Sequence, residues 1–193
     1  MFYQLFIILQ MLFYPPSPDN FEGIIKYNVP NTTDSLIYYI RSDKIRIHRK
    51  GNFVTKYGNY TDELFDLENN RTALYNIEKG EYEFFDNNRT YFPPQKINEK
   101  WTILNHSCEG YEIDYGKVGF ESRMQDKIYV ADSLYFEIPE NCIIQTPMIT
   151  NGTGKIALKQ VRTVESQHSF SESVFEAVKI IPMEIPDSLL LLQ

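Results

Sequence analysis

The chain has 193 residues, a formal net charge of −7 at pH 7, and many tyrosines and phenylalanines. This length suits one domain that buries its own core without a metal or a dense set of disulfides. The acidic charge is spread along the chain and no basic stripe is present, which disfavours nucleic acid as a partner. The abundance of aromatic residues and the scarcity of Ala favour strands over helices.

The N-terminal sequence MFYQLFIILQMLFYPPSP is apolar up to its prolines. A run of roughly 13 apolar residues is too short for a membrane-spanning helix of about 20 residues, and it matches the core of a signal peptide. We therefore expect residues 1–18 to be a signal peptide and residues 19–193 to form a single β-rich domain. The protein is then extracytoplasmic, periplasmic or secreted, with no integral membrane span. A buried first strand is the alternative interpretation of the same run.

From Phe21 onward, short runs of alternating apolar and polar residues are separated by clusters of Gly, Asn and Asp. This pattern predicts antiparallel strands joined by tight turns. The fold class that we expect is mainly β: a curved antiparallel sheet or a half-open β-barrel meander, with little helix. The segment SESVFEAVKI at 171–180 fits a helix and a strand equally well. The expected strands are 21–29, 35–42, 44–50, 53–59, 63–68, 72–78, 81–86, 110–118, 126–132, 134–139, 154–166 and 175–181.

The tetrad Asn-Asn-Arg-Thr occurs twice, at residues 69–72 and 87–90. Each Asn pair follows one expected strand and precedes the next, so we interpret both pairs as turns whose Arg and Thr begin the following strand. The tetrads also contain Asn-x-Thr triplets. We interpret these triplets as a by-product of an Asn-rich and Thr-rich sequence, because they are glycan acceptors only in a host with the required machinery.

The chain has two cysteines, Cys108 and Cys142. An even count is compatible with one disulfide in an oxidising compartment. Such a bridge would add roughly 3–4 kcal/mol of stability by constraining the unfolded chain. Two separate thiols are the equal alternative, because the sequence does not show whether the two Cα atoms come within bonding range.

No sequence motif indicates catalysis, a metal site or a cofactor. The chain lacks a nucleophile elbow, a His-Glu-x-x-His pair and a phosphate-binding glycine loop. His48, His106 and His168 are scattered without the spacing of metal ligands, so we expect surface side chains. The alternation in residues 44–50 likewise predicts that Arg46 lies on the solvent side of a strand. We therefore expect no enzymatic activity, no cofactor and no metal.

Aromatic side chains recur at every second position in several expected strands. They need burial, either in the core of a curved sheet or around an apolar ligand on its concave face. Both interpretations stay open at this point. If a ligand binds there, it is a lipid or another apolar molecule, and the candidate binding residues are Tyr75, Tyr82, Phe84, Tyr111, Ile113 and Tyr115.

Several segments follow one another in a recognisable order. They are FEGIIKY at 21–27, KIRI at 44–47, DLENNRTALYNIEKGEY at 66–82, ILNHSCEGYEI at 103–113, IYVADSLYFEIP at 128–139 and IPDSLLLL at 185–192. This set resembles the secreted bacterial families of unknown function related to the GLPGLI family. The architecture that it implies more distantly resembles the periplasmic carriers of outer-membrane lipoproteins, in which a curved sheet wraps around an apolar cavity, and this likeness implies a carrier role.

These observations together predict an exported, non-catalytic protein of the cell envelope that binds a lipid or another apolar ligand on the concave face of its sheet. The alternative is an interaction or assembly module, in which a sheet edge or a polar face docks another envelope protein. The sequence names neither the ligand nor the partner. It also does not show which face of each strand is concave, because a register error of one residue exchanges the two faces.

Overall fold

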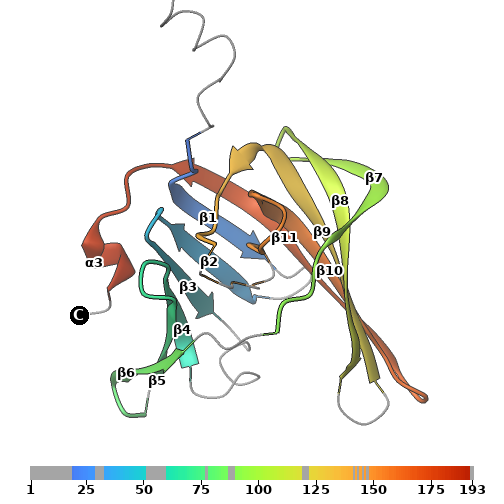
Figure 1. The fold of residues 1–193 in the computed structure, drawn as a ribbon, viewed down its shortest axis with the longest axis horizontal. Coiled ribbons are helices and arrows are strands. Elements are labelled where there is room, and N and C mark those ends of the chain that lie inside the picture. Colours follow the sequence, from blue (N-terminus) through green and yellow to red (C-terminus); the bar gives the residue numbers. More distant parts are fainter. Residues whose placement is uncertain are drawn as a thin grey trace, which may run out of the picture.

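The computed structural model describes residues 19–28, 33–50, 60–76, 78–86, 90–118, 122–140, 142, 144, 146 and 148–191. Strands dominate these residues, and Figure 1 shows one strongly curved antiparallel sheet. The helix in this part of the chain is α3 (Asp187–Leu190), near the C-terminus. The prediction of a mainly β fold with a curved antiparallel sheet is confirmed.

Over the described residues the sheet has eleven strands in the order β6-β5-β4-β3-β2-β1-β11-β10-β9-β8-β7, and they do not close into a barrel. Strands β1 and β11 lie side by side at its centre, so the first and last of these described strands hold the two halves together. The strands are β1 (Gly23–Asn28), β2 (Ser35–Ile40), β3 (Lys44–Lys50), β4 (Tyr60–Asp66), β5 (Arg71–Asn76), β6 (Glu81–Asp86), β7 (Gln95–Ile103), β8 (His106–Val118), β9 (Ser122–Tyr135), β10 (Lys155–Glu165) and β11 (Phe170–Pro182).

The two faces of the sheet differ in what covers them. Cross-strand pairing places Tyr38 of β2 beside Ile47 of β3, and both are buried. The same core cluster contains Phe65 from β4 and Ile113 from β8, although these strands lie far apart in the sheet order. The sheet must therefore bend around this cluster. We call the face that carries it the inner face, and the opposite face the outer face.

The described residues between β9 and β10, drawn in orange in Figure 1, pack against the inner face. Phe136, Cys142 and Ile144 of this segment are each at most 1% exposed and belong to the core cluster. Asn151 holds the segment in shape, because its side chain accepts a hydrogen bond from the Ile144 amide and donates one to the Cys142 carbonyl. The described part of the inner face is thus packed by the chain itself.

Tight turns join the strands at residues that tolerate a positive φ. Asn70 has φ 49° and Gly80 has φ 68°, both between strands. The β7–β8 hairpin has a two-residue turn, Leu104 and Asn105, with φ values of 49° and 65°. Two successive positive φ angles match the twist of the flanking strands. The predicted turn at 69–70 is confirmed, and the pair at 87–88 lies outside the described residues.

Several expected elements differ in the structure. The sequence predicts two strands, at residues 126–132 and 134–139. In the structure residues 126–135 belong to the single long strand β9, and residues 136–139 lie beyond its end. The ambiguous segment 171–180 is part of strand β11, because it pairs with both β1 and β10. The predicted signal peptide at 1–18 and the predicted strand at 53–59 lie outside the described residues. A search of the described helical residues finds no segment with the length and hydropathy of a membrane span.

Candidate functional site

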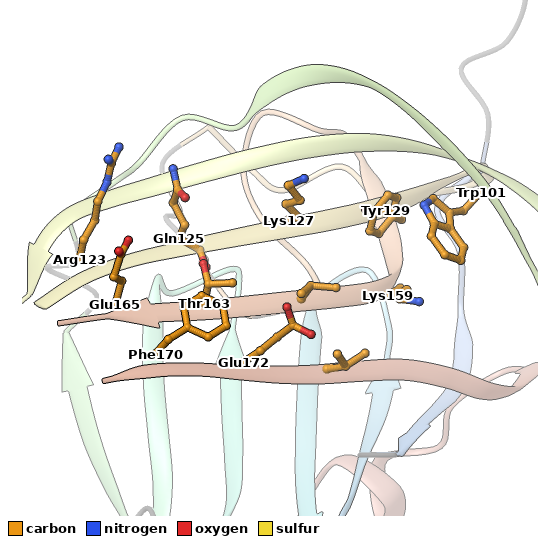
Figure 2. Close-up of a pocket in the computed structure, with 12 residues that line it drawn as sticks. Trp101, Arg123, Gln125, Lys127, Tyr129, Lys159, Thr163, Glu165, Phe170 and Glu172 are labelled. Atoms are coloured by element: carbon orange, nitrogen blue, oxygen red, sulfur yellow. The ribbon is translucent and has the colours of Figure 1, made fainter. Parts of the chain in front are cut away.

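A groove of about 540 Å³ lies on the outer face of β9, β10 and β11 (Figure 2). Its position follows from strand geometry, because residues two apart share a face. Val161, Thr163 and Glu165 of β10 line the groove. Gln160 and Arg162, at the alternate positions of β10, point to the inner face, where both donate hydrogen bonds to the buried carboxylate of Asp126.

The groove has an apolar floor with aromatic side chains at both ends. Val161 and Val174 lie opposite each other on β10 and β11. Figure 2 shows Trp101 and Tyr129 at one end and Phe170 at the other. Trp101 is 47% exposed and Phe170 is 66% exposed, so the groove offers large apolar side chains that are not covered by the described part of the chain. Such exposure is characteristic of binding surfaces.

Strand β7 closes the groove at the Trp101 end because it crosses over the backbone of β8. The pairing of β7 with β8 shifts in register between Lys96 and Lys100, which marks a bulge. The bulged residues pass close to Gly110 of β8, where a Cβ atom would lie 2.9 Å from the Cγ1 atom of Ile97. The Glu99 carbonyl oxygen would lie 3.1 Å from the same Cβ atom, so glycine at this position favours the close approach of the two strands.

A set of polar contacts anchors β7 to the groove wall. Glu99 accepts hydrogen bonds from Lys127 Nζ at 2.8 Å and from the Tyr129 hydroxyl at 2.6 Å. These contacts lower the pKa of Glu99. Burial and the hydrogen bond to Glu99 raise the pKa of Tyr129 to about 12. The Trp101 ring packs edge-to-face on Tyr129, with ring centroids 5.6 Å apart, and Lys159 Nζ lies 4.2 Å from the Trp101 ring centroid.

The charged side chains of the groove form its rim, and local partners neutralise its cations. Lys159 is paired with Glu176 at 2.9 Å, and Arg123 is paired with Asp114. Each pair is partly exposed, so each contributes little to stability by itself. Because the cations already have carboxylate partners, binding in this groove must come mainly from apolar contact. The charged lining residues are Arg123, Lys127, Lys159, Glu165 and Glu172, and the neutral polar ones are Gln125 and Thr163.

The predicted ligand-binding residues fall on two faces of the sheet, at two separate places. Tyr111, Ile113 and Tyr115 alternate along β8 on the inner face, where Ile113 is only 2% exposed. The others lie on the outer face of β5 and β6, where the Tyr75 and Tyr82 rings pack edge-to-face at 5.3 Å. Each stripe shares a face as the alternation predicts, but the structure does not bring the two stripes together. The second stripe consists of Tyr75, Tyr82 and Phe84.

Tyr115 belongs to a closed polar network and not to an open surface. Its hydroxyl donates to Asp126 at 2.8 Å, and its ring packs against Phe92. Asp126 is 1% exposed and also accepts hydrogen bonds from Gln160 and Arg162. Burial, together with the adjacent carboxylate, raises the pKa of Tyr115 above its ordinary value. This network links β8, β9 and β10 across the inner face.

Cys108 and Cys142 are both buried, and they do not form a disulfide in the structure. Cys108 lies on β8, whereas Cys142 lies in the segment that fills the inner face. Burial raises the pKa of the Cys108 thiol to about 11. A thiol of this kind is mostly protonated at neutral pH, so it is a poor nucleophile and a poor metal ligand.

The solvent-side prediction for Arg46 differs from the structure. Arg46 lies on the outer face but is only 8% exposed, because the C-terminal segment covers β3 there. Arg46 Nη1 donates a hydrogen bond to the Leu189 carbonyl of that segment at 2.9 Å. Its Nε donates to Asp62 at 2.6 Å, and His48 Nδ1 contacts the same carboxylate at 3.0 Å. Burial opposes the charge of Asp62, but hydrogen bonds from His48 and Arg46 outweigh it and lower the Asp62 pKa.

The fold is similar to part of PNGF-II. A solved structure of that protein matches this chain with a TM-score of 0.55 and 14% sequence identity, over 88% of this chain and 29% of PNGF-II. This chain therefore spans less than a third of the length of PNGF-II. No protein-family model matches the chain, and no curated protein sequence does. At this identity the likeness shows the fold alone, and no residue role is carried over from it.

The groove residues were not singled out from the sequence. The alternation of Lys159, Val161, Thr163 and Glu165 is visible, but it indicates only a polar face with one valine. Trp101 lies in the polar run QKINEKWTI, which has no strong strand pattern. Within the described ranges, no three His, Cys, Asp or Glu side chains lie close enough together to hold a metal ion.

Proposed function

We propose that this protein is a non-catalytic binding module that holds an apolar or amphipathic ligand, such as an acyl chain, in the outer groove. The observation that carries this proposal is the pair of exposed aromatic residues, Trp101 and Phe170, at the two ends of a valine floor. The volume of about 540 Å³ lies within the range of roughly 300–1,000 Å³ that is typical of small-molecule sites. The apolar N-terminal segment 1–18 supports an extracytoplasmic location for this activity.

The proposal locates the ligand on the outer face and not on the inner one. Phe136 and Ile144 already fill the inner face, and Ile113 is part of the core that they complete. A ligand would have to displace this packing, at a cost of several kcal/mol. The outer groove needs no such displacement, because Trp101 and Phe170 are already exposed.

The expected affinity is moderate. Burial of about 100 Å² of apolar surface contributes about 2.5 kcal/mol, while the loss of ligand freedom costs at least about 4 kcal/mol. A ligand that covers Trp101, Phe170 and the two floor valines buries several times about 100 Å² of apolar surface, so the gain exceeds this cost. We therefore expect dissociation constants on the order of 1–100 μM, with little dependence on salt because the groove cations are already paired.

Trp101 is the one tryptophan of the chain, so its emission reports directly on the groove. We would titrate the protein with stearate and with dibrominated stearate, whose bromine atoms quench tryptophan on contact. Saturable quenching by the brominated chain only is the expected result. Unquenched emission at concentrations well above 100 μM would contradict the proposal, because the affinity estimated from the buried area lies below that concentration.

Two matched substitutions on β11 locate the ligand. Val174→Glu places a charge on the groove floor, whereas Val178→Glu places the same charge at a 45% exposed position outside the groove. We expect the first to weaken binding at least tenfold and the second to leave it unchanged. Equal loss in both variants, with both still folded by circular dichroism, would show that the ligand binds elsewhere.

A further inference from the structure

We propose that the free edge of β6 is a docking site for an extended, basic segment of another protein, which adds to the sheet as a further antiparallel strand. This inference is independent of the outer groove, which lies on β9 to β11. Strand addition supplies main-chain hydrogen bonds for affinity and side-chain contacts for specificity. The two edges of the open sheet, β6 and β7, differ in how they are protected against the addition of another strand.

The β7 edge is protected in the ways that natural sheets use against unwanted pairing. Its register with β8 shifts between Lys96 and Lys100, so the strand is bulged. Both lysines are exposed, and Pro93 and Pro94 precede the strand. Bulges, lysines and prolines each discourage the addition of another strand.

The β6 edge has none of these protections. Its six residues, EYEFFD, contain no Lys and no Pro, and they pair with β5 without a shift in register. Phe84 is 55% exposed and Phe85 is 46% exposed. Because neighbouring residues of a strand point to opposite faces, these two rings lie on opposite sides of the edge. An added strand would find apolar surface on both of its sides.

The outer side of this edge is an ordered aromatic surface. The Tyr75 and Tyr82 rings pack edge-to-face, and Tyr82 lies 6.4 Å from Phe84, centroid to centroid. The Arg71 guanidinium lies over the Phe84 ring at 4.9 Å, which holds the ring in place. The added strand would extend this surface with its own apolar side chains, since aromatic cross-strand pairs stabilise sheets.

The charge of β6 determines which strand it accepts. Its charged residues at neutral pH are Glu81, Glu83 and Asp86, all acidic. Pairing of two β6 strands from two copies would place acidic strands side by side, which is unfavourable, so a second copy is not the occupant. Lys79 pairs with Glu83 at the exposed end of the turn and reduces this charge only in part. The edge therefore fits a segment in which Lys or Arg alternates with apolar residues.

Labelled peptides test this proposal on the full chain. The probes are the synthetic peptide Lys-Val-Lys-Phe-Lys-Val and its acidic counterpart Glu-Val-Glu-Phe-Glu-Val, each carrying fluorescein. We expect the basic peptide to bind with saturable polarisation, and at least tenfold more tightly than the acidic one. It should also slow amide exchange in residues 81–85. Equal binding of both peptides, or no change in exchange at β6, would overturn the proposal.

Two Phe→Lys variants separate the edge from the groove. Phe84→Lys should weaken binding of the basic peptide at least tenfold, whereas Phe170→Lys in the groove should leave it unchanged. Unchanged binding in Phe84→Lys together with weakened binding in Phe170→Lys would overturn the proposal. Self-association of the chain in sedimentation that Phe84→Lys abolishes would also overturn it. If Phe84→Lys unfolds, the exposed substitution Glu81→Lys takes its place with the same expected loss. Stearate binding monitored at Trp101 should be unchanged in the Phe84→Lys variant. The loss of peptide binding at β6 can therefore be distinguished from a loss of ligand binding in the groove.

Discussion

Ile113→Ala distinguishes a core residue from a ligand-binding residue at one of the positions that the sequence favours for a ligand. Ile113 is 2% exposed and belongs to the core cluster of the inner face. The substitution removes three carbon atoms, worth about 2.4 kcal/mol at about 0.8 kcal/mol each, and leaves a cavity that adds to this loss. We expect a total loss of about 3 kcal/mol in the free energy of unfolding.

Urea denaturation followed by circular dichroism measures this loss. With a slope of about 2 kcal/mol per M, the midpoint of Ile113→Ala should fall by about 1.5 M. The control is Phe84→Ala, at a position 55% exposed, which should lose less than about 1 kcal/mol. Stearate binding to the folded Ile113→Ala protein should be unchanged. A loss below about 1 kcal/mol combined with lost binding would refute the assignment of Ile113 to the core.

Three further predictions concern buried and paired groups. Asp62→Asn should lower the free energy of unfolding in urea by about 3–5 kcal/mol, because it leaves the buried Arg46 guanidinium without its carboxylate. The control Asp114→Asn, in an exposed pair, should lose less than about 1 kcal/mol. Equal losses would contradict this difference in burial. Hydrogen bonding to Arg41 lowers the pKa of Asp43 to about 2, so its stabilisation is complete above about pH 4 and is lost as pH falls through about 2. The drop in the free energy of unfolding over this window, measured by urea denaturation, should be about 1–2 kcal/mol smaller in Asp43→Asn. An identical pH profile would refute the pairing. Iodoacetamide should label Cys108 and Cys142 only in urea, and intact mass should show two added groups; labelling of the native protein at pH 8 would contradict their burial.

The alternation of residues predicts the fold class and the membership of each face well. The stripe at residues 111–115 does share one face. Regular pairing from Tyr111 to Asp114 keeps the period-two alternation, and Tyr115 still reaches Asp126 on that face although the register shifts between Asp114 and Gly116. Strand β7 was missed because its bulge near Lys100 breaks the alternation and its residues are mostly polar. The bulge is compatible with Gly110 on the neighbouring strand, a long-range requirement that a local pattern does not show.

What covers each face is the part that the sequence could not predict. Ile113 and a ligand-lining residue have the same pattern, and only the segment around Phe136 and Ile144 decides between them. Arg46 has the pattern of a solvent-facing residue, yet the C-terminal segment covers it from far away in the chain. The groove arises from β9, β10 and β11 together with the crossing of β7, so no single strand contains its signal.

The most direct test of the central claim is a nuclear magnetic resonance titration of the nitrogen-15-labelled protein with decanoate. The account predicts that the indole resonance of Trp101 and the amides of Val161 and Val174 shift together and saturate at one ligand per chain, while the resonances of Ile113 and Tyr115 stay in place. Shifts confined to Ile113 and Tyr115 would place the ligand on the inner face and contradict the account.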